Sequence, residues 1–164
     1  MTRRKKPVRR SRPAHRFEHA ELRGAAFEDV TLAGAAFDDV DLSEARLKNV
    51  DLGKAELDDV SLAGARMNNL DLEGAEIRDA SLVRCVLVDI DLSAVRLRDA
   101  TLARAKLSDV DLSRAELEDA RLTGARLRNV DLRNVRITDA SIEGLTIDGV
   151  RIDRLLARVR RKGH

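Results

Sequence analysis

Large apolar residues recur at every fifth position, from Leu22 to Ile152, 27 times without a break. Two residues before each of them stands a small or branched apolar residue, from Ala20 to Val150, and the other three positions are mostly polar or small. An interval of two keeps side chains on one side of an extended chain, but three more residues of straight strand would carry the next one to the opposite face. The pattern therefore predicts a coil of short extended legs joined by turns, because neither a helix nor a flat strand has this period.

The number of sides follows from the period at which apolar residues of equal size stack. Steps of twenty residues give uniform columns, one large (Val30, Val50, Leu70, Ile90, Val110, Val130, Val150) and one small (Ala25, Ala45, Ala65, Cys85, Ala105, Ala125). Steps of fifteen mix the two sizes. The sequence therefore predicts four sides and twenty residues per coil, and six to seven coils stacked at roughly 4.8 Å make a rod about 30 Å tall.

The repeat A-(D/N/S/T)-L-x-x, seen in "VDLSEARLKNVDLGKAELDDVSL", resembles that of the pentapeptide-repeat family. The resemblance implies an all-β fold, a right-handed quadrilateral β-helix, over residues 17–152. Because no inserted loop interrupts the repeat, the chain resembles the loop-free members of the family that mimic DNA, bind DNA gyrase or topoisomerase IV and confer quinolone resistance.

Both ends of the chain differ from the coil. Residues 1–16 carry eight cations and no acid, so we expect a disordered tail that either stays solvated or contacts nucleic acid or another anionic partner. Residues 153–164 predict a short helix with Asp153 as N-cap and a small apolar face of Leu155, Leu156 and Val159. This face either caps the last coil or forms a homodimer, since the gyrase-binding members that the chain resembles pair through their C-terminal ends.

Candidate catalytic groups are few. The three histidines lie near the ends of the chain, and the single cysteine, Cys85, occupies an inward position in the small column, which indicates a structural role. No phosphate-binding loop or metal-ligand spacing is present, so the sequence predicts no enzyme, no cofactor and no metal. It also contains no apolar run of membrane-spanning length, and a soluble cytoplasmic protein is expected.

Charge is strongly segregated, since residues 17–152 hold 28 acidic and 18 basic side chains between two basic ends. Steps of twenty residues produce two columns of aspartate alone. The Asp51 column contains Asp51, Asp71, Asp91, Asp111 and Asp131, and the Asp39 column contains Asp39, Asp59, Asp79, Asp99, Asp119 and Asp139. A mixed column contains Asp29, Asn49, Asn69, Asp89, Asp109 and Asn129.

The mixed column accepts either residue, as expected for side chains that close turns by bonding to backbone N–H groups. The two aspartate columns require another explanation, because neighbouring carboxylates repel by roughly 1 kcal/mol in water. They are either neutralised by adjacent arginine columns or retained to contact a partner.

One coil carries an apolar surface patch. Val83, Val86 and Val88 occupy outward positions that are polar or charged in most other coils. The patch predicts either a contact surface or ordinary surface variation.

Two functional hypotheses follow. Two charge lines at one per 4.8 Å give about one charge per 2.4 Å of rod, against one per 1.7 Å for duplex DNA, so the acidic rod can occupy a basic groove made for DNA. Together with the resemblance, this predicts a DNA mimic that binds a bacterial type II topoisomerase and modulates it or protects it from quinolone-type inhibitors. The alternative is a scaffold or interaction adaptor that uses the valine patch and the basic tails.

Overall fold

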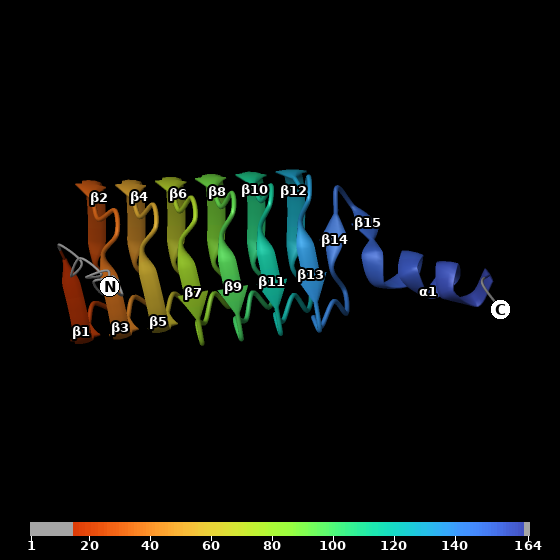
Figure 1. The fold of residues 1–164 in the computed structure, drawn as a ribbon, viewed down its shortest axis with the longest axis horizontal. Helices are drawn as coiled ribbons and strands as arrows, with labels where there is room; N and C mark the ends of the chain where they lie inside the picture. Colours follow the sequence, from red (N-terminus) through yellow and green to blue (C-terminus); the bar gives the residue numbers. More distant parts are fainter. Residues whose placement is uncertain (1–14, 163–164) are drawn as a thin grey trace, which may run out of the picture.

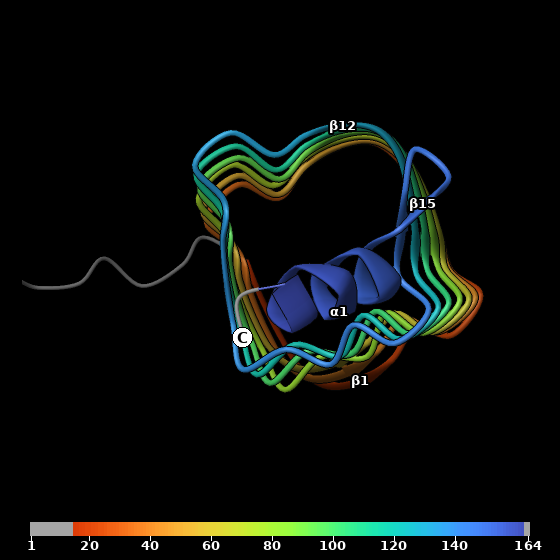
Figure 2. The ribbon, with the colours of Figure 1, turned by 90° about the vertical axis from the view of Figure 1, so that its right-hand side faces the viewer.

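The computed structural model describes residues 15–162. They form a coil of short strands followed by one helix, and the coil is four-sided when viewed along its axis (Figure 1 and Figure 2). The predicted fold class, an all-β, right-handed quadrilateral β-helix with a short C-terminal helix, is confirmed. The predicted N-terminal tail lies outside the described residues, except for His15 and Arg16.

The strands alternate between two sheets along the rod. The odd sheet contains β1 (Arg16–Glu21), β3 (Ala36–Asp41), β5 (Glu56–Ser61), β7 (Glu76–Arg78), β9 (Arg96–Arg98), β11 (Glu116–Glu118) and β13 (Arg136–Thr138). The even sheet contains β2 (Ala26–Thr31), β4 (Arg46–Asp51), β6 (Arg66–Asp71), β8 (Val86–Asp91), β10 (Lys106–Asp111), β12 (Arg126–Asp131), β14 (Thr146–Ile147) and β15 (Val150–Arg151). All neighbouring strands are parallel except β14 and β15.

The register confirms the twenty-residue coil. Leu47 pairs with Met67 and Val50 with Leu70, so residues twenty apart lie directly above one another. The apolar columns face inward, and the alanines at the centre of the coil are fully buried. The enclosed space amounts to only about 30 Å³ and is lined entirely by apolar side chains, so the rod is a packed core and not a channel.

Left-handed backbone at every fifth residue makes the corners. From His19 to Gly149 each such residue has φ between 49° and 80°, whether or not it is glycine. At half of the corners a backbone bond closes a tight turn, as from the Ala45 N–H to the Leu42 carbonyl, 3.1 Å apart. At the others a strand bends at its middle, as at Asn49, or ends just before the corner, as at Asp79. This conformation costs an ordinary L-residue about 1–2 kcal/mol, and Gly, Asn and Asp adopt it most readily.

Helix α1 (Ile152–Lys162) leaves the last coil and continues along the rod axis (Figure 1). Leu155, Leu156 and Val159 are 48%, 41% and 61% exposed, so the helix does not seat this face on the coil as a lid. The predicted N-cap, Asp153, lies one residue inside the helix. It accepts bonds from the Gly144 N–H (3.2 Å) and from both the Nε and Nη2 of Arg151 (2.9 and 2.6 Å), which anchor the start of the helix to the coil.

Element ends lie close to the domain boundaries expected at residues 17 and 153. Strand β1 begins at Arg16 and α1 begins at Ile152.

Candidate functional site

The Asp51 column lies at the ends of the even strands, and every carboxylate in it is fixed by the backbone. Each Oδ1 accepts a hydrogen bond from the N–H two residues later, at 2.9 Å from Gly53, 2.8 Å from Glu73, 2.8 Å from Ser93, 2.7 Å from Ser113 and 2.9 Å from Arg133. The turn-closing role that we expected of the mixed column therefore belongs to this column. It yields a line of carboxylates with one orientation, repeated in five successive coils.

The mixed column lies beside it, at corners of positive φ where the even strands bend. Its side chains bond to one another. Asn49 donates to Asp29 (2.7 Å), Asn69 to Asn49 (2.9 Å) and Asn129 to Asp109 (2.6 Å). The tolerance of both Asn and Asp here reflects a left-handed corner and a side-chain ladder, and not a bond to backbone N–H groups.

An open groove of about 470 Å³ runs between these two columns. Its floor consists of Val50, Leu70 and Ile90. Its walls are formed by Asn49, Asp51, Asn69, Asp71, Asp89, Asp91, Asp109 and Asp111. The groove therefore has a narrow apolar floor, one wall of aspartates and a second wall that mixes aspartate with asparagine.

The Asp39 column lies in the odd sheet, at corners of positive φ on the other side of the coil. The structure therefore does not bring the two aspartate columns together into one groove. Asp39 bonds to the Nδ1 of His19 at 2.8 Å, and this hydrogen bond raises the pKa of the histidine. The carboxylates of the other members of the column have no hydrogen-bond or ion-pair partner among residues 15–159.

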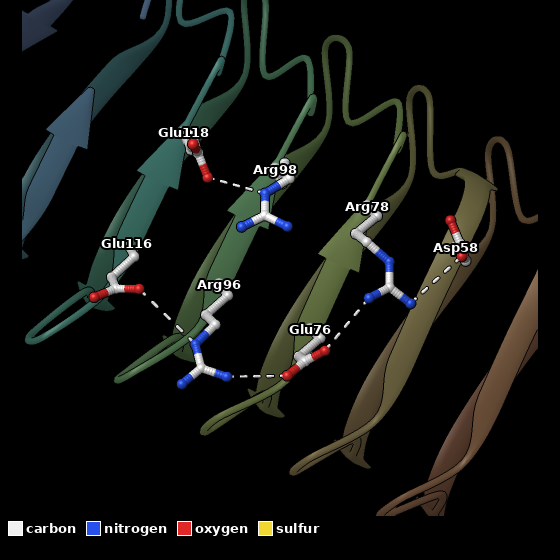
Figure 3. A network of polar contacts seen from close by, with 7 residues as sticks. All are labelled: Asp58, Glu76, Arg78, Arg96, Arg98, Glu116 and Glu118. Carbon is white, nitrogen blue, oxygen red and sulfur yellow. Dashed lines mark hydrogen bonds and ion pairs between the residues drawn. The ribbon is translucent and has the colours of Figure 1, made fainter. Parts of the chain in front are cut away.

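Ion pairs are concentrated elsewhere, on the outward residues of the odd strands, which we call the paired face (Figure 3). Arg96 lies between Glu76 (3.0 Å) and Glu116 (3.8 Å), and Arg98 bonds to Glu118 at 2.9 Å. In these pairs a long side chain reaches an opposite charge one coil away, across twenty residues of sequence. The paired face shows how this rod neutralises charge.

The aspartate columns are not neutralised in this way. Among the described residues, only Asp131 in the Asp51 column has an ion pair, with Arg133, whose side-chain and backbone hydrogen bonds lower the pKa of the carboxyl. The expected alternative, systematic pairing of the columns with adjacent arginines, is therefore wrong for residues 15–159.

A basic face adjoins the mixed column on the other side. It is formed by outward residues at the starts of the even strands and at the preceding corners: Arg46, Lys48, Arg66, Arg84, Arg104, Lys106, Arg126 and Arg128. All are exposed. Lys48 pairs with Glu28 at 2.6 Å, and the others have no ion pair within the described part of the chain. Sequence reasoning named several of these residues only as neighbours of the acidic columns.

The predicted valine patch lies on and beside this basic face. Val86 and Val88 are half-buried on β8, and Val83 lies beyond the corner formed by Arg84. Val86 pairs with Arg66 on one side and Lys106 on the other. The patch therefore interrupts a line of cations.

The described residues offer few candidates for a catalytic or metal site. Cys85 is fully buried, as predicted, and burial raises the pKa of its thiol to about 12, so it stays protonated. Among residues 15–162, no group of three or more His, Cys, Asp and Glu side chains is arranged to hold a metal ion. No helix in this range is both long and apolar enough to span a membrane.

Comparison with known families identifies the coil. The family description "Pentapeptide repeat region" matches residues 75–152, and "Pentapeptide repeats (8 copies)" matches residues 16–49, 41–79 and 55–93. The chain belongs to the pentapeptide-repeat family, whose members are in general not catalysts. No curated protein matches the sequence.

Several solved structures are similar to this chain to different degrees. A trypsin-treated form of QnrB1, a plasmid-mediated fluoroquinolone resistance protein, is similar with a TM-score of 0.58 and 20% identity, covering 88% of this chain and 78% of that one. Full-length QnrB1 gives 0.46 and 18%, covering 88% and 87%. HetL, from Nostoc sp. strain PCC 7120 and involved in heterocyst differentiation regulation, gives 0.26 and 18%, covering 81% and 87%.

Proposed function

We propose that this protein is a DNA mimic that inserts its acidic surfaces into the DNA-binding groove of a bacterial type II topoisomerase, modulating the enzyme or protecting it from quinolone-type inhibitors. The observation that carries the proposal is the unneutralised Asp51 column, whose carboxylates are held in one orientation by backbone N–H groups. Such a line needs no reordering when it meets a basic partner. The function is binding, and it takes place in the cytoplasm, where the chromosome lies.

Charge density supports this proposal. Between Asp51 and Asp111 the acidic groove and its rim hold seven carboxylates without an ion pair: Asp51, Asp71, Glu73, Asp89, Asp91, Asp109 and Asp111. Over four coils of about 4.8 Å this is roughly one charge per 2.7 Å, against one per about 1.7 Å of duplex DNA. The Asp39 column is the second line. Because it lies on the other sheet, it would meet the opposite wall of an enclosing groove, as the second strand of a duplex does.

The family resemblance and the similarity to QnrB1 favour a topoisomerase as the partner. Gyrase supercoiling is the test, with and without a fluoroquinolone, at micromolar protein. We expect the wild-type protein to change supercoiling or drug inhibition. The triple variant Asp71→Asn, Asp91→Asn, Asp111→Asn should lose at least about tenfold in potency, because three charge-assisted contacts are removed. An Asn Oδ1 can still accept the backbone N–H, so the fold is retained.

The matched control is Glu76→Gln, Glu116→Gln, Glu118→Gln on the paired face. It changes the net charge by the same amount and should leave the potency unchanged. No effect of the wild-type protein at micromolar excess, or equal losses in both variants, would refute the proposal and favour the adaptor function, with the valine patch and the basic tails as contact surfaces.

We further propose that the C-terminal end forms a homodimer. Leu155, Leu156 and Val159 are exposed at the tip of the rod, together with Val150 on β15. We propose a second copy of the chain as the partner of this apolar face. Pairing the two ends buries the face and doubles the length of the rod, and the lines of charge become twice as long with it. Light scattering should give a dimer for the wild-type protein and a monomer for Leu156→Glu with Val159→Glu. A wild-type monomer at tens of micromolar would contradict this.

A further inference from the structure

The basic face is a second charged surface with no counterpart in the proposed mimicry. Seven of its cations make no ion pair within residues 15–159, and the segments outside the described residues contain no acidic side chain. Like charges even lie opposite each other, since Arg46 pairs in register with Arg66, and Lys106 with Arg126. Such pairs destabilise a sheet.

The paired face shows that the same fold can supply acidic partners to its cations, even where like charges lie in register, as Arg78 and Arg98 do. There, Arg96 in one coil lies between Glu76 and Glu116 in the coils on either side. The two faces have the same coil spacing and the same outward positions on strands, so the fold itself does not dictate unpaired cations. A partner that supplies the missing anions accounts for them.

We propose that the basic face binds the phosphate backbone of a duplex nucleic acid. Its cations extend over five successive coils, from Arg46 to Arg126. Four steps of about 4.8 Å span about 19 Å, along which a duplex carries about eleven phosphates, roughly half of them on the side that faces the protein. Seven exposed cations, six of them arginines able to donate two bonds to one phosphate, match this number.

The valines fit the same partner. Val86 separates Arg66 from Lys106 in the strand column, while Arg84 at the preceding corner keeps one cation in the same coil. The strand column therefore forms two groups of cations, centred about three coils, or about 14 Å, apart, which is close to the 12 Å width of the major groove. Each group can contact one of the two phosphate strands that border a groove, with Arg84 between them.

A second copy of this chain, offering its acidic groove, is the competing partner. The distribution of charge in the sequence favours nucleic acid. Residues 1–16 add eight cations, so the N-terminal ends of two copies lying side by side in the same direction would repel each other. A polyanion is attracted by the face and by both ends.

The test is fluorescence anisotropy of a labelled 16-base-pair duplex, titrated with the full-length protein at 50–200 mM KCl. For the wild-type protein we expect micromolar affinity near 100 mM salt and a steep salt slope. Replacing Arg46, Arg66, Lys106 and Arg126 with Gln should weaken binding about 30-fold or more and make the salt slope shallower by about 3.6, since each phosphate contact contributes about 0.9.

The matched control replaces Arg78, Arg96, Arg98 and Arg136 with Gln. This control also removes four positive charges, and both variants keep the N-terminal tail. An equal loss of DNA affinity in the two variants would therefore assign binding to net charge or to the tail, and it would overturn the proposal. The proposal would also be overturned if the basic-face variant changed the oligomeric state in light scattering and kept its DNA affinity. That result would identify a second copy of the chain as the partner of the basic face. Circular dichroism verifies that both variants are folded. A negative gyrase assay leaves this inference intact, because the acidic columns take no part in it.

Discussion

Replacing Asp79 with Asn should make the protein more stable. Asp79 lies in the Asp39 column between Asp59 and Asp99, each one coil away, at a corner with φ of 49°. Asn69 occupies the equivalent corner on the even sheet with φ of 55°, so the backbone accepts Asn without strain. In the mixed column each such Asn donates its Nδ2 to the residue twenty positions earlier, at 2.6–2.9 Å. The amide introduced by Asp79→Asn would find the carboxylate of Asp59 in the same place.

The gain can be worked out from two terms. Two unit charges about 4.8 Å apart repel by about 0.9 kcal/mol in water, and screening at 0.15 M salt leaves about half of that, so removing two repulsions contributes about 0.9 kcal/mol. One new hydrogen bond adds about 0.5–1.5 kcal/mol. We therefore expect the free energy of unfolding to rise by about 1.4–2.4 kcal/mol.

Urea denaturation followed by circular dichroism measures this. With a slope of about 2 kcal/mol per molar urea, the midpoint should rise by about 0.7–1.2 M, and the difference should shrink as salt is added because part of the gain is relief of repulsion. Asn69→Asp is the reverse control and should lower the midpoint, since it loses the bond to Asn49 and places a carboxylate beside Asp89. A lower midpoint for Asp79→Asn would refute the reasoning, because it would mean that the carboxylate itself stabilises the fold. A higher midpoint means that the column is kept at the expense of stability, as a binding surface would be.

Three further predictions concern the core, the thiol and the helix. Leu87→Ala, at a side chain 1% exposed, should lower the free energy of unfolding by about 2–5 kcal/mol in urea denaturation. Leu155→Ala on the exposed helix is the control and should change it by less than about 0.5 kcal/mol. Equal effects of the two substitutions would contradict the packed core. The buried thiol of Cys85, with its pKa of about 12, should react with Ellman's reagent only as fast as the coil unfolds, so rapid labelling of the native protein would contradict its burial. The bond from Arg151 lowers the pKa of Asp153, so its stabilisation of α1 is complete above about pH 4 and is lost as the pH falls through the lower, folded value. Helical ellipticity should therefore fall in acid, and Asp153→Asn should abolish this change; an acid transition that persists in the variant would point to another group.

The fold could be predicted because one physical requirement repeats through the sequence. Spacings of two and three between apolar residues demand a corner every five residues, and the uniform columns at steps of twenty fix the number of sides. The sequence did not show that every corner is left-handed, since Arg84, Ala94 and Arg104 stand there as well as Gly and Asn. In those coils, packing of the flanking Leu and Ala residues overrides local preference.

The charged surfaces were only partly predictable. The sequence shows which side chains stack, but not which backbone N–H lies beneath each one, so the turn-closing role was assigned to the mixed column instead of the Asp51 column. Steps of twenty residues do show which arginines have a carboxylate one coil away. Arg96 lies between Glu76 and Glu116, whereas Arg66 lies between Arg46 and Val86.

Each coil bonds only to the coils above and below it, so the number of coils, and with it the length of the rod, can change. The Arg46 N–H bonds to Ala25 in the preceding coil, and the Leu32 N–H bonds to Asp51 in the next, so a twenty-residue layer is satisfied by whichever layers adjoin it. Removing or duplicating one layer in phase would shift both charged faces by one step of about 4.8 Å without creating a new kind of contact. Duplication or deletion of whole twenty-residue layers in the gene can therefore fit the length of the rod to partners of different size.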